Sequence, residues 1–167
     1  MNINSNSLDG FDKVWDRVVS DNDRHHGHRP PPTKPPCECE TLRRMMDSAA
    51  QSAEVYRQLA RQCRNRRDAA MFSEMSRDES AMLNELQSAY YLITGDSYRP
   101  QVKPQRSQGM LSRIREQYHR ELKSAQMYED TIRENKISNI SAICKKNIAI
   151  ERRHAENLER IINNVMR

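Results

Sequence analysis

The sequence predicts an all-α protein whose main domain is a four-helix bundle made of two helical hairpins. Three observations lead to this prediction. The composition favours helices, because only 4 of the 167 residues are Gly and only 5% are aromatic. Apolar residues recur every three or four positions along four long segments, which is typical of helices with one buried face. The last two segments repeat the first two at a fixed offset, so one supersecondary unit occurs twice.

The first 39 residues are predicted to precede the bundle. Residues 1–20 contain a short amphipathic helix, which either docks on the main domain or, through residues 8–19, binds another protein with Trp15 as the anchor. Residues 21–39 form a His- and Pro-rich linker, expected to be disordered because its five prolines exclude helix. Its histidines and the pair Cys37 and Cys39 could bind a soft metal, but their spacing matches no zinc module. The apolar face of the N-terminal helix consists of Leu8, Phe11, Val14, Trp15, Val18 and Val19.

Residues 40–167 are predicted to form the bundle, with helices over about 40–64, 68–94, 110–135 and from 137 to about 166. A short turn near residues 65–67 makes the first two helices antiparallel neighbours. Residues 95–109 contain Pro100 and Pro104 and form a long crossover between the hairpins. Fifteen extended residues reach about 50 Å, which is enough to run the length of a helix of about 25 residues.

Each predicted helix has one stripe of inward-facing positions. In chain order the stripes are Leu42, Met45, Ala49, Ala53, Tyr56, Ala60 and Cys63; Phe72, Met75, Glu79, Met82, Leu86, Ala89 and Ile93; Leu111, Ile114, Tyr118, Glu121, Ala125, Tyr128 and Ile132; and Ile140, Cys144, Asn147, Glu151, His154, Leu158, Ile161 and Val165. Three carboxyls and one imidazole therefore lie among mostly apolar side chains. They belong to Glu79, to Glu121 and, in the middle of the last stripe, to Glu151 and His154.

The two hairpins repeat each other with an offset of 72 residues and no gap. The matching pairs are Tyr56 and Tyr128, Ser52-Ala53 and Ser124-Ala125, Glu79 and Glu151, and Leu86 and Leu158. Equivalent residues of such a repeat are expected to face each other across a pseudo-two-fold core. The polar positions are not all repeated: Ala49 corresponds to Glu121, and Met82 corresponds to His154.

The inward-facing carboxylates need a source of positive charge. Burying an ionised carboxylate is costly unless something pairs with it. None of the four stripes contains Lys or Arg, and the imidazole of His154 supplies at most one unit of charge. Either two of the three carboxyls hold protons with strongly raised pKa values, or a cation is bound among Glu79, Glu121, Glu151 and His154.

At these residues the chain, from about 40 to 167, resembles the ferritin-like superfamily and, within it, the rubrerythrin-like di-iron carboxylate bundles. Their mark is a Glu on the first helix of each hairpin and Glu-x-x-His on the second. The resemblance implies that Glu79 and Glu151 bridge two metals and that Glu121 and His154 complete one of them. With Ala49 and Met82 the first half-site is degenerate, so the resemblance implies one ion, iron or manganese.

Two functions from different classes follow. The first is a metal-binding bundle with oxidoreductase-type chemistry on dioxygen or peroxide. The second is a metal-free structural or protein-interaction bundle descended from a di-iron protein. The sequence leaves open whether the protein is an enzyme. Tyr56 and Tyr128 are either core residues or redox partners of the site, and Asn147 is either a donor to it or a buried residue that fixes helix register.

The charge pattern and the apolar segments limit the partners. The net charge is +5 and the pI about 9.2, but Lys and Arg alternate with Asp and Glu and form no basic run interleaved with aromatics. We therefore expect no nucleic-acid partner. No segment approaches the roughly 18 apolar residues of a membrane span, and residues 1–10 are polar. A cytoplasmic protein with reduced cysteines is expected, and a homodimer is compatible with the sequence.

Overall fold

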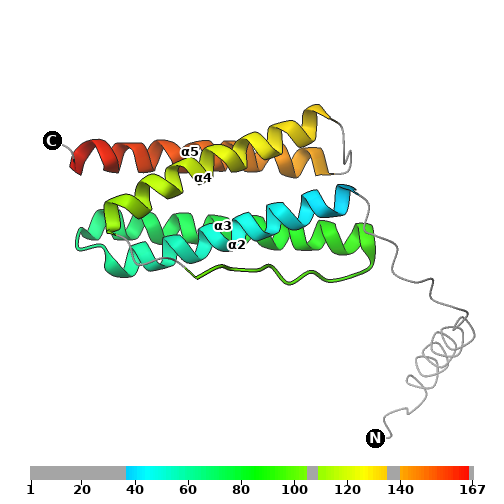
Figure 1. The fold of residues 1–167 in the computed structure, drawn as a ribbon, viewed down its shortest axis with the longest axis horizontal. Helices are drawn as coiled ribbons and strands as arrows, with labels where there is room; N and C mark the ends of the chain where they lie inside the picture. The colour runs from blue at the N-terminus through cyan, green and yellow to red at the C-terminus, as the bar shows by residue number, and fades with distance from the viewer. Residues whose placement is uncertain (1–36, 105–108, 135–139, 166–167) are drawn as a thin grey trace, which may run out of the picture. The chain divides into compact units, whose positions relative to one another are not determined.

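The computed structural model describes residues 37–104, 109–134 and 140–165, and these residues form four α-helices and no strand. The helices are α2 (Cys37–Gln62), α3 (Arg66–Thr94), α4 (Met110–Arg133) and α5 (Ser141–Val165), as Figure 1 shows. The prediction of an all-α, four-helix protein is confirmed for this part of the chain. The predicted amphipathic helix, and the linker up to residue 36, lie outside the described residues.

The helices pack as two pairs. α2 lies against α3, and α4 against α5, while α2 also contacts α4 and α3 contacts α5. In Figure 1 the α2–α3 pair forms one layer and the α4–α5 pair the other. Each helix therefore contributes one face to a shared interior, as in a four-helix bundle.

Three helix starts differ from the predictions, and one of them is that of α5, which begins at Ser141 and not at residue 137. α2 begins at Cys37, so residues 37–39 belong to the helix and not to the linker. α3 begins at Arg66, within the predicted turn. The reason is Asn65, whose side chain accepts hydrogen bonds from the backbone N–H groups of Arg67 (2.9 Å) and Asp68 (3.3 Å). This N-cap satisfies donors that the first turn leaves unpaired, so the helix starts directly after it.

The first part of the connection between α3 and α4 lies along α2. Gly95 ends α3 in the left-handed conformation (φ 72°), which glycine adopts without a Cβ clash, and its N–H donates to the carbonyl of Tyr91 (2.8 Å). The side chain of Asp47 on α2 then accepts from the hydroxyl of Tyr98 and from the backbone N–H of Gln101. These bonds hold residues 95–104 against the bundle (Figure 1).

The interior consists of two apolar clusters with a polar layer between them. One cluster is built on Cys39, Leu42, Met45, Met46, Met82, Leu86, Ala89, Tyr90, Tyr128, Ile140 and Cys144, and the other on Val55, Tyr56, Leu59, Phe72, Met75, Ile114, Leu158 and Ile161. On every helix the residues between these groups include the buried polar ones, such as Ser52, Glu79, Glu121 and Glu151. The polar layer is therefore enclosed from both ends of the bundle by apolar packing.

Three predictions about burial need correction. Ile93 and Val165 were expected to face inward but are 40% and 60% exposed, because they lie in the last turns of α3 and α5. Arg113 is buried, although we expected no basic residue inside; its guanidinium donates to Gln62 (2.7 Å) and Gln58 (2.9 Å). It precedes Glu121 by eight residues, about 12 Å along α4. No helix among the described residues has the length and apolar character to span a membrane.

Candidate metal centre

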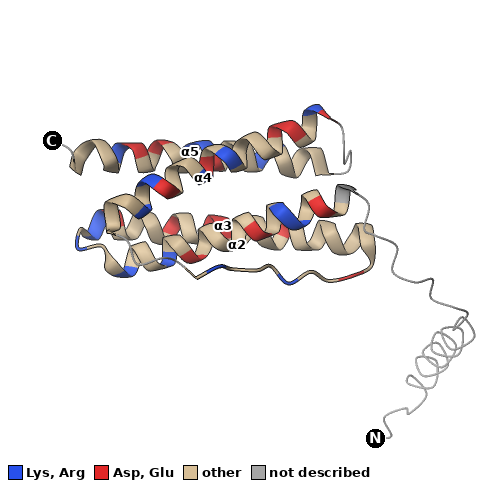
Figure 2. Cartoon of the chain, in the orientation of Figure 1, with Lys and Arg blue, Asp and Glu red and all other residues tan. Residues whose placement is uncertain are grey.

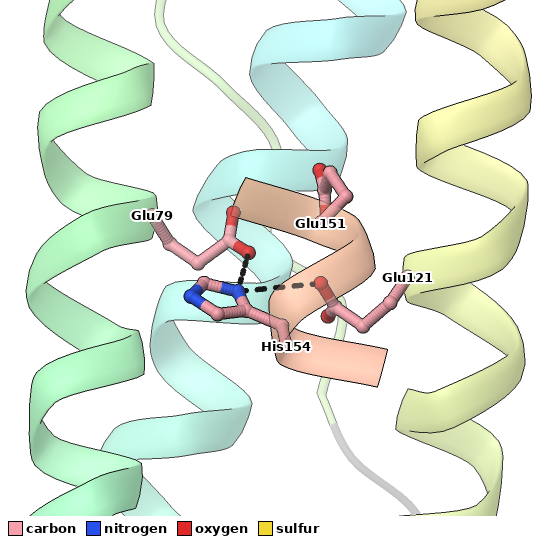
Figure 3. Close-up of side chains that lie close together, drawn as sticks. All are labelled: Glu79, Glu121, Glu151 and His154. Atoms are coloured by element: carbon pink, nitrogen blue, oxygen red, sulfur yellow. Dashed lines mark hydrogen bonds and ion pairs between the residues drawn. The ribbon is translucent and has the colours of Figure 1, made fainter. Parts of the chain in front are cut away.

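The four ionisable side chains predicted to face inward meet in the polar layer. α3 contributes Glu79, α4 contributes Glu121, and α5 contributes both Glu151 and His154, which lie one turn apart (Figure 3). One potential ligand atom from each of the four lies within 4.8 Å of the others. Ligands on opposite sides of one metal ion lie about 4 Å apart at bond lengths near 2.1 Å. Adjacent ligands lie closer, at about 3–3.5 Å, so the side chains would have to move together by roughly 1–2 Å to coordinate a single ion.

The donor atoms are enclosed and incompletely hydrogen-bonded. Glu79, Glu121 and His154 are fully buried, and Glu151 is 2% exposed. With all three carboxyls ionised, the Oε2 atom of each has no hydrogen-bond donor among the described residues. Buried polar atoms are nearly always hydrogen-bonded, so an unsatisfied oxygen on each of three neighbouring carboxyls is unusual. Oxygen donors with one imidazole nitrogen suit iron, manganese or zinc, so the donor set fits the ion that the resemblance implies.

The three carboxyls differ in their pKa values, which are raised for two of them and lowered for the third. Burial, together with the charge of Glu121, raises the pKa of Glu79 to about 8, and burial with both neighbouring carboxyls raises the pKa of Glu151 well above its usual value. Burial opposes ionisation of Glu121 too, but its interactions with Glu151 and His154 lower its pKa overall. In the metal-free protein at neutral pH, Glu121 is therefore ionised while Glu79 and Glu151 hold protons.

His154 is the positive partner of these carboxyls. Burial disfavours its charged form, but Glu121 and Glu79 outweigh this effect and raise the pKa of His154 to about 10. Its Nδ1 lies 3.2 Å from Oε1 of Glu79 and 3.5 Å from Oε2 of Glu121 (Figure 3). An imidazolium, one carboxylate and two protonated carboxyls together carry no net charge. Without a metal, the cluster is thus balanced by protons.

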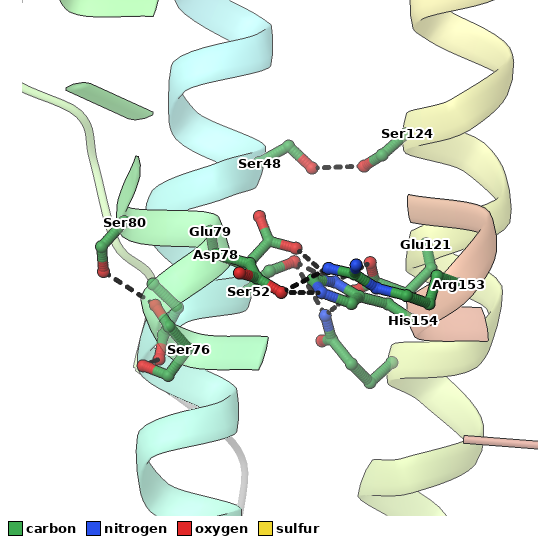
Figure 4. Close-up of polar contacts among 12 residues, drawn as sticks. Ser48, Ser52, Ser76, Asp78, Glu79, Ser80, Glu121, Ser124, Arg153 and His154 are labelled. Atoms are coloured by element: carbon green, nitrogen blue, oxygen red, sulfur yellow. Dashed lines mark hydrogen bonds and ion pairs between the residues drawn. The ribbon is translucent and has the colours of Figure 1, made fainter. Parts of the chain in front are cut away.

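The other ring nitrogen of His154 is held by an acid outside the cluster. Nε2 lies 3.1 Å from Oδ2 of Asp78, and the same oxygen accepts a hydrogen bond from Arg153 (2.7 Å), as Figure 4 shows. A carboxylate on Nε2 fixes the ring orientation and leaves Nδ1 directed at the cluster. When His154 loses a proton, Asp78 favours the tautomer in which Nδ1 carries the free lone pair, which is the form that binds a metal.

A second polar network orients Glu121. The side-chain amide of Gln117 donates to Oε1 of Glu121 and to the hydroxyl of Ser52 (2.7 Å), and Ser52 in turn lies 3.4 Å from the same carboxylate oxygen. Both partners bind Oε1, so Oε2 is the oxygen left facing His154. Gln117 and Ser52 are buried, and they tie α4 to α2 at the level of the site.

The positions equivalent to Glu121 and His154 in the first hairpin provide no metal ligand. Ala49 and Met82 are both buried, at 2% and 1% exposure, and Met82 belongs to an apolar cluster. Tyr56 is buried next to the site with its ring edge against His154, at 5.6 Å between centroids, and its hydroxyl has no hydrogen-bond partner among the described residues. Burial and the nearby carboxyls raise the pKa values of Tyr56 and Tyr128, so both phenols stay protonated.

Asn147 is fully buried one turn before Glu151. Neither its side-chain nitrogen nor its oxygen has a hydrogen-bond partner among the described residues. Burial raises the pKa of the neighbouring Tyr128 phenol more strongly than the hydrogen-bonding capacity of Asn147 lowers it, and the two roles considered from the sequence both stay open.

Comparison of the chain with protein-family models, with curated proteins and with solved structures finds no match.

Sequence reasoning identified the four clustered residues but missed those that position them. Gln117 precedes Glu121 by four residues, so its place on the inward face could have been found from helical spacing. Asp78 gave no such signal, because a residue next to Glu79 points about 100° away from it and resembles any acid on a solvated face. Only the packing of α3 against α5 brings Asp78 to His154.

Proposed function

We propose that the protein binds one iron or manganese ion through Glu79, Glu121, Glu151 and His154. The observation that carries the proposal is the convergence of three carboxyls and one imidazole in a fully buried layer, with an unsatisfied oxygen on each carboxyl. A divalent cation would neutralise the charge of the clustered carboxylates, which bound protons neutralise in the metal-free protein. It would also provide a partner for each of the three unsatisfied oxygens.

The residues opposite this site favour one ion and not two. A second ion would need a carboxylate near Ala49 and an imidazole near Met82, and both positions are filled by buried apolar side chains. A thioether is a poor ligand for iron or manganese, which prefer oxygen and nitrogen donors. Glu79 and Glu151 would then coordinate the same single ion as Glu121 and His154.

The proposed ancestry is a ferritin-like, rubrerythrin-like di-iron bundle in which the first half-site has been lost. Its support is the 72-residue repeat, because Tyr56 and Tyr128, and likewise Glu79 and Glu151, are buried at matching positions of the two hairpins. The long connection between α3 and α4, whose residues 95–104 run along α2, agrees with the crossover such a fold requires.

A bound iron or manganese ion would supply redox chemistry toward dioxygen or peroxide. The protein's own contribution would be to hold His154 through Asp78, to hold Glu121 through Gln117 and Ser52, and to exclude bulk water from the layer. Glu79 and Glu151 would lose their protons as the ion enters, and they could take up protons again during a reaction.

Calorimetric titration of the metal-free protein with Mn²⁺ tests the proposal, and anaerobic Fe²⁺ provides a second ion. We expect saturation at about one equivalent and a higher melting temperature, since an ion at 100 times its Kd stabilises the fold by about 2.7 kcal/mol. Glu121→Gln should abolish both effects. Glu129→Gln is the matched control. It removes a carboxylate from the same helix as Glu121, but this carboxylate pairs with Arg152 outside the cluster.

The second candidate is a metal-free structural or interaction bundle, and the observation favouring it is the proton balance of the cluster. Two protonated carboxyls, one carboxylate and an imidazolium leave no net charge to compensate. Under this hypothesis neither ion would bind or raise the melting temperature. Glu121→Gln would then change stability only, in the same way with and without added metal.

A further inference from the structure

A second site candidate lies on the outside of the bundle, between α2, the crossover and α4. It is a pocket of about 500 Å³. Four of its lining residues are basic, namely Arg44, Lys103, Arg120 and Lys123, and only one is acidic. Figure 2 shows Lys and Arg on all three of these segments. The volume falls in the range of about 300–1,000 Å³ that is usual for small-molecule sites.

The one acidic residue of the pocket is already engaged. The carboxylate of Asp47 accepts from the hydroxyl of Tyr98 (3.0 Å to either oxygen) and from the backbone N–H of Gln101 (2.9 Å). Arg44, Lys103 and Lys123 form no ion pair within the part of the chain that the structure describes. With Asp47 counted, four basic side chains against one carboxylate leave the lining with an excess of three positive charges.

The crossover lysine is fixed in place by its backbone. The N–H of Lys103 donates to Oε1 of Gln51 (2.7 Å), and Nε2 of Gln51 donates back to the carbonyl of Lys103 (3.3 Å). This reciprocal pair attaches the crossover to α2 where Gln51 lines the pocket. A ligand would meet a preformed wall, which lowers the entropic cost of binding.

Arg120 has unused hydrogen-bonding capacity. Its Nε is buried and has no acceptor among the described residues, and its closest acid, Glu116, lies 3.6 Å from another guanidinium nitrogen. A buried donor without an acceptor is unfavourable, and the planar guanidinium matches the geometry of phosphate oxygens. The hydroxyls of Ser48 and Ser124, which lie 2.8 Å apart and bridge α2 to α4, add neutral polar groups to the lining (Figure 4).

We propose that this pocket binds a small anion that carries phosphate groups. Four basic side chains from three segments would surround the phosphates, while Ser48, Gln51 and Ser124 provide polar contacts for the rest of the ligand. The site is separate from the carboxylate cluster: Ser124 and Glu121 are one turn apart on α4, and only Glu121 belongs to the cluster. Anion binding does not depend on whether the protein holds a metal.

The test is a titration of the metal-free protein, after removal of any chelator, with inorganic phosphate and then with pyrophosphate. ¹H–¹⁵N correlation spectra should show saturable shifts at residues that line the pocket, with pyrophosphate binding more tightly. The double variant Arg44→Gln/Lys123→Gln should weaken pyrophosphate binding by at least about fivefold, since two charges within contact range are lost.

The matched control is Arg66→Gln/Arg67→Gln, which removes the same charge from exposed positions at the start of α3. It should change the affinity less than about twofold, because it alters only the screened long-range field. Equal weakening in the two double variants would overturn the proposal, because binding would then reflect the net charge of +5. The absence of saturable shifts at the pocket would also overturn it, whatever the result of the metal titrations.

Discussion

Metal uptake by the buried cluster should release protons, and the structure predicts how many. In the metal-free protein, the pKa of Glu79 is raised to about 8, that of Glu151 lies well above its usual value, and that of His154 is raised to about 10. At pH 7 each of these three groups holds a proton, while Glu121 holds none. Coordination requires carboxylates and a neutral imidazole, so one ion should displace about three protons.

Buffer-dependent calorimetry measures this number. Mn²⁺ is titrated into the protein at pH 7 in several non-coordinating buffers with different ionisation enthalpies. The slope of observed enthalpy against buffer enthalpy is the number of protons released per ion, and we expect about three. Glu129→Gln should give the same slope, because this carboxylate pairs with Arg152 outside the cluster.

A slope near zero with normal Mn²⁺ binding would refute the reasoning. The carboxyls would then be ionised before the metal arrives, and burial would not control their protonation. Glu79→Gln provides a finer check, because it removes one titrating group. Where this variant still binds Mn²⁺, its slope should be smaller by about one proton.

Residues in and around the cluster, and the buried thiol of Cys144, give four further testable expectations. Ala49→Glu combined with Met82→His should raise the Mn²⁺ stoichiometry from about one to about two, measured by calorimetry, because it supplies the donors that the first hairpin lacks. Asp78→Asn should weaken Mn²⁺ binding by about 10–100-fold in the same titration, since it removes the carboxylate that orients the histidine. Because the pKa of Glu79 is raised, the folded protein binds one more proton than the unfolded chain between about pH 4.5 and 8. The unfolding free energy of the metal-free protein, measured in urea melts, should therefore fall as the pH rises across that window. Burial raises the pKa of Cys144 to about 11, so mass spectrometry should find this thiol unmodified by iodoacetamide in the folded protein and modified after unfolding.

The periodicity of apolar residues predicted the four helices well. It works because every helix here buries one face against two neighbours, so the inward positions must recur at helical spacing. The same spacing placed Glu79, Glu121, Glu151 and His154 inside, and all four meet in one layer. Periodicity is less informative at helix ends, where Ile93 and Val165 continue the pattern but are exposed.

The residues that support the site could not be predicted in the same way. Asp78 and His154 are 76 residues apart along the chain, and their contact depends on how α3 packs against α5. Arg113 lies on none of the predicted inward stripes, but it is buried because Gln58 and Gln62 provide acceptors on α2. Such pairings are set by the relative rotation of packed helices, which one helix's sequence does not determine.

Anomalous diffraction from crystals of the protein grown with Mn²⁺ tests the central proposal most directly. Data collected on either side of the manganese absorption edge locate the ion without reference to any assumed ligand. We predict one strong anomalous peak in the buried layer, bonded to Glu79, Glu121, Glu151 and His154, and no peak beside Ala49 and Met82. A bundle folded as described, with no peak among these four side chains at saturating Mn²⁺, would contradict it.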